Sequence, residues 1–253
     1  MRKSFSPATI PIVASGPDWL VVSKPAGLLV HPTRPDGTIT LQGLLRQWLG
    51  PELAGIGQVS LIHRLDRETS GLLLVATTVA AARHFSRQIE RGAMDKEYRA
   101  IVFGWPDWDE QEVNAPILRE GSRGPFRIWL KQAIHPDGVP ARTEFSIRTR
   151  FERDGEKFAL LAVRPRTGRM HQIRVHAAAL RHPLVGDKIY GPDETCYLRF
   201  IETGWTPTLA RSLWLPRHAL HAHRLGFLDP DGRRIEVTAT PPEDLQSFAG
   251  SWP

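Results

Sequence analysis

This sequence contains almost no cysteine. Cys196 is the only one among 253 residues, so the chain cannot form an intramolecular disulfide and lacks a second thiol for a zinc cluster. A reducing, cytoplasmic location is therefore expected. No stretch approaches the roughly 18 apolar residues of a membrane span, and the N-terminus lacks the apolar core of a secretory signal. We expect a protein that is neither secreted nor membrane-spanning.

Acidic residues are also in deficit. Asp and Glu number 27 against 33 Lys and Arg, which gives a net charge of +6. This balance favours a polyanionic partner such as nucleic acid, although ordinary surface charge is the alternative explanation. The sequence has no internal repeat, no low-complexity tract and no linker that would split it. We therefore expect a single domain over residues 18–253, preceded by an extension of residues 1–17.

Hydrophobic periodicity predicts both helices and strands. Strands are expected over 18–23, 71–76, 97–103 and 144–151, and a hairpin is expected over 219–239 that turns at 229–232. In the strand over 144–151, alternation places Phe145, Ile147 and Phe151 on one face. Helices are expected over 41–49, capped by Thr40 and stopped by Gly50 and Pro51, and from Thr77 or Thr78 to Gly92, with Val79, Ala82, Phe85 and Ile89 inward. Residues 104–142 have weak periodicity, which is typical of a long surface excursion. The mixture lacks a regular βαβ alternation, so an α+β fold is the better class.

The stretch HRLDRETSGLLLVA, at residues 63–76, places ionisable side chains directly before a buried strand. A loop that ends at Ser70 would deliver Asp66 to the rim of the sheet, where catalytic side chains usually lie. Arg64 or Arg67 could hold the carboxylate there. On this segment alone, an ordinary turn carboxylate in a surface salt bridge is the simpler interpretation.

A second cluster, RPRTGRMHQIRVHAAALRHPLVGDKIYG, starts at Arg164 and is strongly basic. It contains a single acid, Asp187. Its cations are Arg164, Arg166, Arg169, Arg174, Arg181 and Lys188. A helix is expected whose buried face comprises Met170, Ile173, Ala177 and Leu180. Its N-terminal turn would suit a phosphate. The spacing of the histidines His171, His176 and His182 argues against a metal site.

A third cluster, KEYRA, enters the strand expected over 97–103. Tyr98 there shares a face with Ala100 and Val102. By itself, a tyrosine in a strand is more typical of a core than of a catalytic site.

Together these three clusters, in this order, resemble the RluA family of pseudouridine synthases. The resemblance extends to DWLVVSKPAGLLVHP at 18–32 and to RHALHAHRLGFLDPDGRRIEVTATPPEDL at 217–245. It implies the pseudouridine synthase fold, in which helices and loops flank a largely antiparallel mixed sheet with a catalytic cleft across it. It also implies isomerisation of uridine within ribosomal RNA of the large subunit or within transfer RNA, without any cofactor or metal.

The resemblance assigns roles by position. Asp66 would be the essential carboxylate, which attacks the anomeric carbon or the base, or takes the 2′ proton. Enclosure disfavours a charged carboxylate, so Arg174 would pair with Asp66 and compensate. Tyr98 would pack against the base and help remove the proton from carbon 5. The residues expected to bind the flipped nucleotide or nearby phosphates are Arg64, His63, Arg166, Arg169 and His171.

Some alternatives stay open from the sequence. A non-catalytic RNA-binding protein on the same fold would keep the arginines, and a glycosidase would need a second carboxylate, for which Glu68 is the nearest candidate. Met170 stands where family members often have Thr or Ser. A separate N-terminal RNA-binding module is expected to be absent, and residues 193–217 form an insertion of open role. Structured RNA is the expected partner of a monomer with no obligatory protein partner.

Overall fold

The structure, a computed structural model, describes residues 5–6, 9–32, 37–50, 59–122, 127–250 and 252. The chain divides into two compact units. Unit 1 comprises residues 1–96 and 221–242, and unit 2 comprises residues 97–220 and 243–253. The expectation of one catalytic domain over 18–253 stays a prediction.

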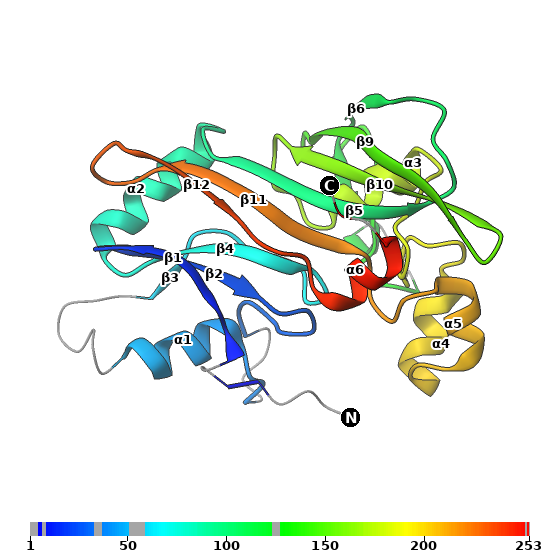
Figure 1. The fold of residues 1–253 in the computed structure, drawn as a ribbon, viewed down its shortest axis with the longest axis horizontal. Helices are drawn as coiled ribbons and strands as arrows, with labels where there is room; N and C mark the ends of the chain where they lie inside the picture. The colour runs from blue at the N-terminus through cyan, green and yellow to red at the C-terminus, as the bar shows by residue number, and fades with distance from the viewer. Residues whose placement is uncertain are drawn as a thin grey trace. The chain divides into compact units, whose positions relative to one another are not determined.

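Unit 1 is built on a sheet in which most strand pairs are antiparallel (Figure 1). Its strands are β1 (Ile12–Gly16), β2 (Trp19–Lys24), β3 (Ser60–Leu61), β4 (Ser70–Ala76), β11 (Leu220–Leu228) and β12 (Arg234–Thr238). β4 pairs antiparallel with β2 and parallel with β11, and β11 forms with β12 the hairpin expected over 219–239. All residues of β4 are buried, which confirms the buried strand expected over 71–76.

Two helices of unit 1 begin where the capping residues predict. Thr40 accepts a hydrogen bond from the backbone N–H of Gly43 at the start of α1 (Leu41–Leu49), and Thr78 caps α2 (Val79–Glu90) in the same way. Pro51, the expected stop signal, lies outside the described residues. Val79 was expected to face inward but is 48% exposed, because the buried face of α2 starts at Ala81 and continues through Phe85 and Gln88.

The core of unit 1 lies between α2 and the sheet. Phe85 of α2 packs with Leu72 and Leu74 of β4 and with Phe227 of β11. The Phe227 ring meets the Trp19 ring edge-on, with centroids 5.1 Å apart. This packing makes β4 a rigid support for the loop that precedes it.

Unit 2 contains a second run of strands, in the order β5–β10–β9–β6. Their bounds are Asp95–Phe103 for β5, Glu110–Asn114 for β6, Arg142–Arg153 for β9 and Glu156–Pro165 for β10; β5 starts in unit 1. The excursion expected over 104–142 is therefore more regular than its sequence suggests. It supplies β6 and a small hairpin of β7 (Ile117–Arg119) and β8 (Gln132–Ile134), with a 3-10 turn at Glu120–Ser122.

A bulge divides β9 into two parts that face opposite ways. Thr149 pairs with Leu160 and Ile147 pairs with Leu161, so Arg148 is the extra residue. The alternation over 144–151 predicted that Phe145 and Phe151 share a face, and this is wrong. One extra residue reverses the direction of every side chain beyond it.

Unit 2 also contains helices. They are α3 (Gln172–Ala179), α4 (Thr195–Thr203), α5 (Pro207–Leu213) and α6 (Glu243–Ala249). α6 packs its Leu245 and Phe248 onto Phe158, and α4 and α5 lie side by side around Cys196 (Figure 1). The insertion expected over 193–217 is thus a folded helical pair. Within the described part of the chain, no helix is long and apolar enough to cross a membrane.

Candidate active site

Asp66 lies in a tight loop immediately before β4. The backbone N–H of Thr69 donates to the carbonyl of Asp66 at 3.1 Å, which closes a turn between them. Gly71 follows with φ of +112°, and a Cβ there would stand 2.2 Å from the carbonyl oxygen of Ala222. The chain can approach β11 so closely only because this residue is glycine.

A buried lysine fixes the backbone on the other side of Asp66. The Lys24 ammonium, fully buried, donates to the carbonyls of Pro25 and Leu28 at 2.9 Å and of Arg67 at 3.1 Å. Arg67 also exchanges hydrogen bonds with the backbone of Gly27. The SKPAG turn therefore holds the residue next to Asp66 through charge-assisted bonds, a role that sequence analysis missed.

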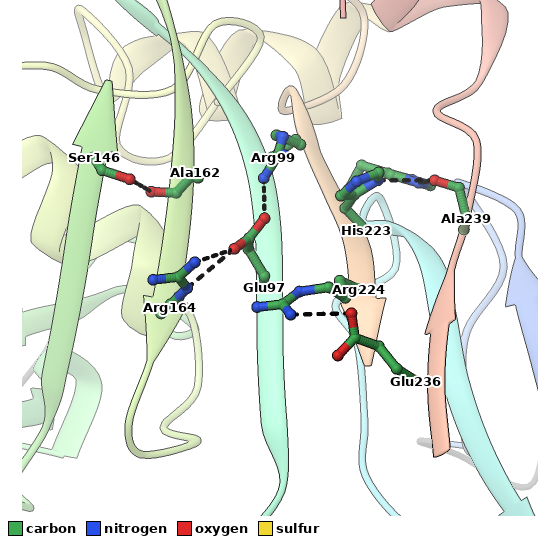
Figure 2. A network of polar contacts seen from close by, with 10 residues as sticks. Glu97, Arg99, Ser146, Ala162, Arg164, His223, Arg224, Glu236 and Ala239 are labelled. Carbon is green, nitrogen blue, oxygen red and sulfur yellow. Dashed lines mark hydrogen bonds and ion pairs between the residues drawn. The ribbon is translucent and has the colours of Figure 1, made fainter. Parts of the chain in front are cut away.

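A serine and a histidine join β4 to β11 at the same end. The Ser70 hydroxyl lies 3.0 Å from Nδ1 of His221, whose Nε2 lies 3.3 Å from the carbonyl of Ala239. A carbonyl only accepts, so Nε2 donates and Nδ1 accepts from the hydroxyl. His223 donates to the same carbonyl at 2.9 Å (Figure 2). These bonds set the register in which β4 starts.

His63 and Arg64 differ in their surroundings. Nε2 of His63 accepts from the backbone N–H of Leu74 at 3.2 Å. Burial and the charge of Lys96 lower the pKa of His63 to about 3, so the ring is neutral near pH 7. Arg64 is exposed, and within the described residues its guanidinium has no hydrogen-bond or ion-pair partner. His63 thus supports β4, and the RNA contacts of both residues stay predictions.

Tyr98 and α3 lie on the same face of the unit 2 sheet. Tyr98 pairs with Val163, and Val163 pairs with Phe145, so these side chains share a face. Thr143, two residues before Phe145, projects from that face too and accepts from the Gln172 amide at 2.9 Å. Tyr98, which is buried, and Arg174 of α3 therefore come from adjacent elements on one side of the sheet. Asp66 belongs to unit 1, and its ion pair with Arg174 stays a prediction.

The Arg174 guanidinium is held by Asp187. Nε donates to Oδ2 at 2.6 Å and Nη2 donates to Oδ1 at 2.9 Å, and the carboxylate is fully buried. Oδ1 also accepts the backbone N–H groups of Ile189 and Tyr190 at 3.0 Å. Burial alone would raise the pKa of Asp187, but the charge and hydrogen bonds of Arg174 hold it far below its usual range. The pair fixes one edge of the guanidinium.

Tyr190 supports the same guanidinium from its face. The Cζ atom of Arg174 lies 5.0 Å from the centroid of the Tyr190 ring, a cation–π contact. The Tyr190 hydroxyl accepts from the backbone N–H of Gln132 at 2.8 Å and lies 2.8 Å from Nδ1 of His171. His171, expected to bind RNA, adopts a left-handed conformation with φ of 57° just before α3.

Gln172 holds the turn that leads into α3. Its Oε1 accepts from the Thr167 hydroxyl at 2.7 Å and from the backbone N–H of Arg169 at 3.0 Å. Its Nε2 donates to Thr143 and to the carbonyl of Arg142. The helix consequently begins at Gln172, and Met170, expected on its buried face, lies outside it.

Arginines of the basic cluster have acidic partners on neighbouring strands. Arg164 donates to Glu97 through Nε at 3.0 Å and Nη2 at 2.8 Å, and Arg99 pairs with the same carboxylate (Figure 2). Arg166 is bidentate to Glu144 at 2.8 and 2.7 Å. Burial acts to raise the pKa of Glu97, but the hydrogen bonds and charges of Arg99 and Arg164 lower it overall.

The basic cluster that begins at Arg164 therefore carries a smaller uncompensated positive charge in the folded unit than its sequence suggests. β-pairing brings in carboxylates that lie far away in the sequence. Arg169, the remaining arginine expected to contact phosphate, donates from Nε to the carbonyl of Pro140 at 3.0 Å and is exposed. RNA contacts of Arg166 and Arg169 stay predictions.

Comparison with known proteins identifies the family of the chain. The family model described as RNA pseudouridylate synthase matches residues 18–179, more than half of the chain. This chain belongs to the RNA pseudouridylate synthase family. The resemblance to the RluA family is thereby confirmed, and the matched region contains Asp66, Tyr98 and Arg174.

Curated relatives in this family include bacterial enzymes. The ribosomal large subunit pseudouridine synthase D of Xanthomonas campestris is 40% identical over 231 residues, which cover 90% of this chain and 64% of that protein. The protein of the same name from Zymomonas mobilis is 36% identical, over 95% of this chain and 72% of that protein. The chain thus spans just under two thirds of the length of the Xanthomonas relative.

Solved structures of the family have the same fold. Human RNA Pseudouridylate Synthase Domain Containing 1 superposes with a TM-score of 0.71 at 28% identity, over 97% of this chain and 89% of that chain. Human RNA Pseudouridylate Synthase Domain Containing 4 superposes with a TM-score of 0.70 at 23% identity, over 92% and 89%. The α+β pseudouridine synthase fold is confirmed.

Proposed function

We propose that this protein is an RNA pseudouridine synthase, which isomerises uridine within an RNA chain. The observation that carries the proposal is the family match over residues 18–179, because a single alignment contains Asp66, Tyr98 and Arg174, one from each motif cluster. The reaction breaks the bond from N1 of uracil to the ribose and joins carbon 5 to the same sugar carbon. A proton leaves carbon 5 and N1 gains one, so atoms and electrons balance without a cofactor.

Asp66 is the proposed catalytic carboxylate. Its ionised form attacks the anomeric carbon or the base, or removes the 2′ proton. The backbone clamp of Lys24 and the rigid β4 support this role, since a reacting group must be held in place. Tyr98 packs against the uracil ring and assists removal of the proton from carbon 5. Arg174 supplies the compensating positive charge.

Arg174 suits that role because its own position is fixed. The Asp187 carboxylate and the Tyr190 ring hold one edge and one face of the guanidinium. An arginine that is pre-organised in this way interacts with a second carboxylate at little further cost in side-chain entropy. Its proposed pairing with Asp66 would keep that carboxylate ionised when a substrate encloses it.

The proposed substrate is ribosomal RNA of the large subunit. The names of the Xanthomonas and Zymomonas relatives, which are ribosomal large subunit pseudouridine synthases, support this choice over transfer RNA. The target nucleotide must be flipped out of its stack, at a cost of roughly a few kcal/mol. Arg64, which is exposed beside Asp66, would fill the vacated space or hold the flipped nucleotide. We also propose action in the cytoplasm, as a monomer with no obligatory protein partner.

The test maps pseudouridines in total RNA from cells with and without the gene. Deletion should remove at least one site, which the wild-type gene restores and Asp66→Ala does not. The matched control is Glu68→Ala, a carboxylate of the same loop, which should restore the site. If deletion removes no site, or if Asp66→Ala restores it, the proposal fails.

The alternatives give different results in the same test. A non-catalytic RNA-binding protein would bind RNA, but its deletion would change no pseudouridine. A glycosidase would need Glu68 as well as Asp66 and would release free uracil.

A further inference from the structure

The β7–β8 hairpin of unit 2 combines buried and exposed apolar side chains. Ile117 and Ile128 are buried, and they pack with Val175 of α3 and with the Tyr190 ring. Trp129, the residue after Ile128, is 58% exposed, the most open of the large apolar side chains in and next to this hairpin; the others are Leu130, Ile134 and Val139. Exposed apolar side chains that gather in one segment are typical of an interaction site.

The Trp129 indole rests against the backbone of Gly121. A Cβ at Gly121 would stand 2.6 Å from Cε3 of the indole, so the bare backbone of Gly121 lies against that ring. The guanidinium of Arg119 lies 6.0 Å from the ring centroid, at the outer limit of a cation–π contact. With these two contacts, Trp129 still has 58% of its surface exposed, so aromatic surface remains open to a ligand.

Hydrogen bonds keep Trp129 in this position. The backbone N–H of Lys131 donates to the carbonyl of Ile128 at 3.1 Å, and that of Glu120 donates to the carbonyl of Lys131 at 3.0 Å. The Lys131 ammonium pairs with Glu194 of the neighbouring helical segment at 2.6 Å and with Glu120 at 3.6 Å. The ring is thus presented on a braced turn, which lowers the entropy cost of binding to it.

The same hairpin is joined to the support of Arg174. The backbone N–H of Gln132, the first residue of β8, donates to the Tyr190 hydroxyl. The Tyr190 ring contacts the Arg174 guanidinium. A ligand that stacks on Trp129 is therefore connected to Arg174 through a short chain of contacts within unit 2.

We propose that Trp129, with Arg119 beside it, is a stacking platform for an unpaired nucleobase of the RNA substrate. The proposal rests on the proposed function, which supplies the RNA. Every nucleobase has a flat aromatic face that stacks on indole, and cations nearby attract the phosphates. Arg119 and Arg127 are such cations, and both are exposed on this hairpin. The positive charge of Arg119 and Arg127 favours RNA, which is anionic, over an uncharged apolar peptide as the occupant.

The experiment measures binding of the full-length protein to a fluorescein-labelled 12-nucleotide oligouridylate by fluorescence anisotropy. Trp129→Ala should raise Kd about tenfold, which is within the range for one stacked base. Trp129→Phe, which keeps an aromatic face, should stay within about threefold of wild type by the same reasoning. Trp205→Ala removes another exposed tryptophan of unit 2, at 38% exposure, and should leave Kd unchanged.

Salt dependence separates stacking from simple charge. Loss of Trp129 should leave the slope of log Kd against log salt unchanged, whereas Arg119→Ala should reduce it by about one phosphate contact. Equal Kd values for wild type and Trp129→Ala would overturn the proposal, and so would equal losses in Trp129→Ala and Trp205→Ala. The proposal would also be overturned if Trp129→Ala weakened binding of a protein ligand and left oligouridylate binding intact.

The result is separable from the test of the enzyme activity. If Asp66→Ala abolishes pseudouridine formation but Trp129→Ala binds oligouridylate like wild type, only the stacking platform is refuted. If deletion of the gene removes no pseudouridine but Trp129→Ala still weakens oligouridylate binding, only the proposed function is refuted.

Discussion

Asp187→Asn should destabilise the protein more than the loss of the carboxylate from any other ion pair described in unit 2. The carboxylate is fully buried, and the Arg174 side chain is 6% exposed. Asparagine keeps the shape but places an amide N–H₂ against an N–H of the guanidinium. Removal of one partner from a buried ion pair costs about 3–5 kcal/mol, because the other charge is left buried and unpaired.

A matched control exists in the same unit. Arg217 binds Asp244 with the same two-bond geometry, at 2.6 and 2.9 Å, but the Asp244 side chain is 38% exposed. The Arg217 side chain is only 9% exposed, but water already reaches the Asp244 carboxylate and can replace its hydrogen bonds to the arginine after Asp244→Asn, so the expected loss is smaller, about 1 kcal/mol. At about 2–4 °C per kcal/mol for a chain of this size, Asp187→Asn should lower Tm by about 10 °C and Asp244→Asn by about 3 °C.

Thermal unfolding followed by circular dichroism measures both shifts. If Asp187→Asn lowers Tm no more than Asp244→Asn does, the reasoning from burial is refuted. The pH dependence gives a second check. The pKa of Asp187 is lowered in the folded state, so its stabilisation is present above the unfolded value of about 4 and is lost as the pH falls below it. The difference between wild type and Asp187→Asn should therefore be constant from about pH 5 to 8 and shrink only below about pH 4.

A double variant separates stability from catalysis. Arg174→Met combined with Asp187→Leu removes both charges, and an apolar pair of similar volume often restores part of the lost stability. We expect a Tm above that of Asp187→Asn, together with no pseudouridine formation. Restored activity in this double variant would exclude Arg174 from the catalytic site.

Two further predictions concern the support of Asp66. Gly71→Ala should lower the free energy of unfolding by about 3 kcal/mol or more, because the new Cβ would clash with the backbone of Ala222 and the positive φ is unfavourable for alanine. Gly155→Ala, with φ of +81° and nothing within 4 Å of the new Cβ, should lower it by only about 1 kcal/mol. Urea unfolding measures both losses. Equal losses would show that steric contact is unimportant. His63 has its pKa lowered from 6.5 to about 3 in the folded state, so its contribution to stability is present above pH 6.5 and is lost as the pH falls towards 3. His63→Gln should remove at most about 3 kcal/mol of acid-dependent destabilisation between pH 7 and 4, and His135→Gln should not. Identical Tm profiles for wild type and His63→Gln would contradict this account.

Helices defined by local interactions were predictable from sequence. The caps of Thr40 and Thr78 need only a hydroxyl and an N–H three residues later, so α1 and α2 start where expected. α3 starts later than expected because Gln172 bonds to Thr143 on a distant strand and His171 turns into a left-handed conformation. No local pattern encodes a bond between residues so far apart in the chain.

Strand faces show the same distinction. Period-2 alternation identified the strand that contains Phe145, but the bulge at Arg148 reversed the direction of Phe151. A bulge arises from how two strands pair, and neither strand alone specifies it.

The sequence by itself determined the family and the α+β class, and it singled out Asp66, Tyr98 and Arg174 as candidate site residues, because these depend on motifs that are contiguous in the chain. Only the tertiary structure decided what holds them. Lys24 clamps the Asp66 loop, and Asp187 with Tyr190 fixes Arg174.

Tertiary structure also decided which charges are compensated. Read along the chain, the segment that begins at Arg164 has one acid; in the folded unit, Glu97 and Glu144 arrive on neighbouring strands and pair with Arg164 and Arg166. Coulomb energy depends on distance in space, whereas a sequence window measures distance along the chain. Motif chemistry is therefore readable from sequence, and its electrostatic setting requires the fold.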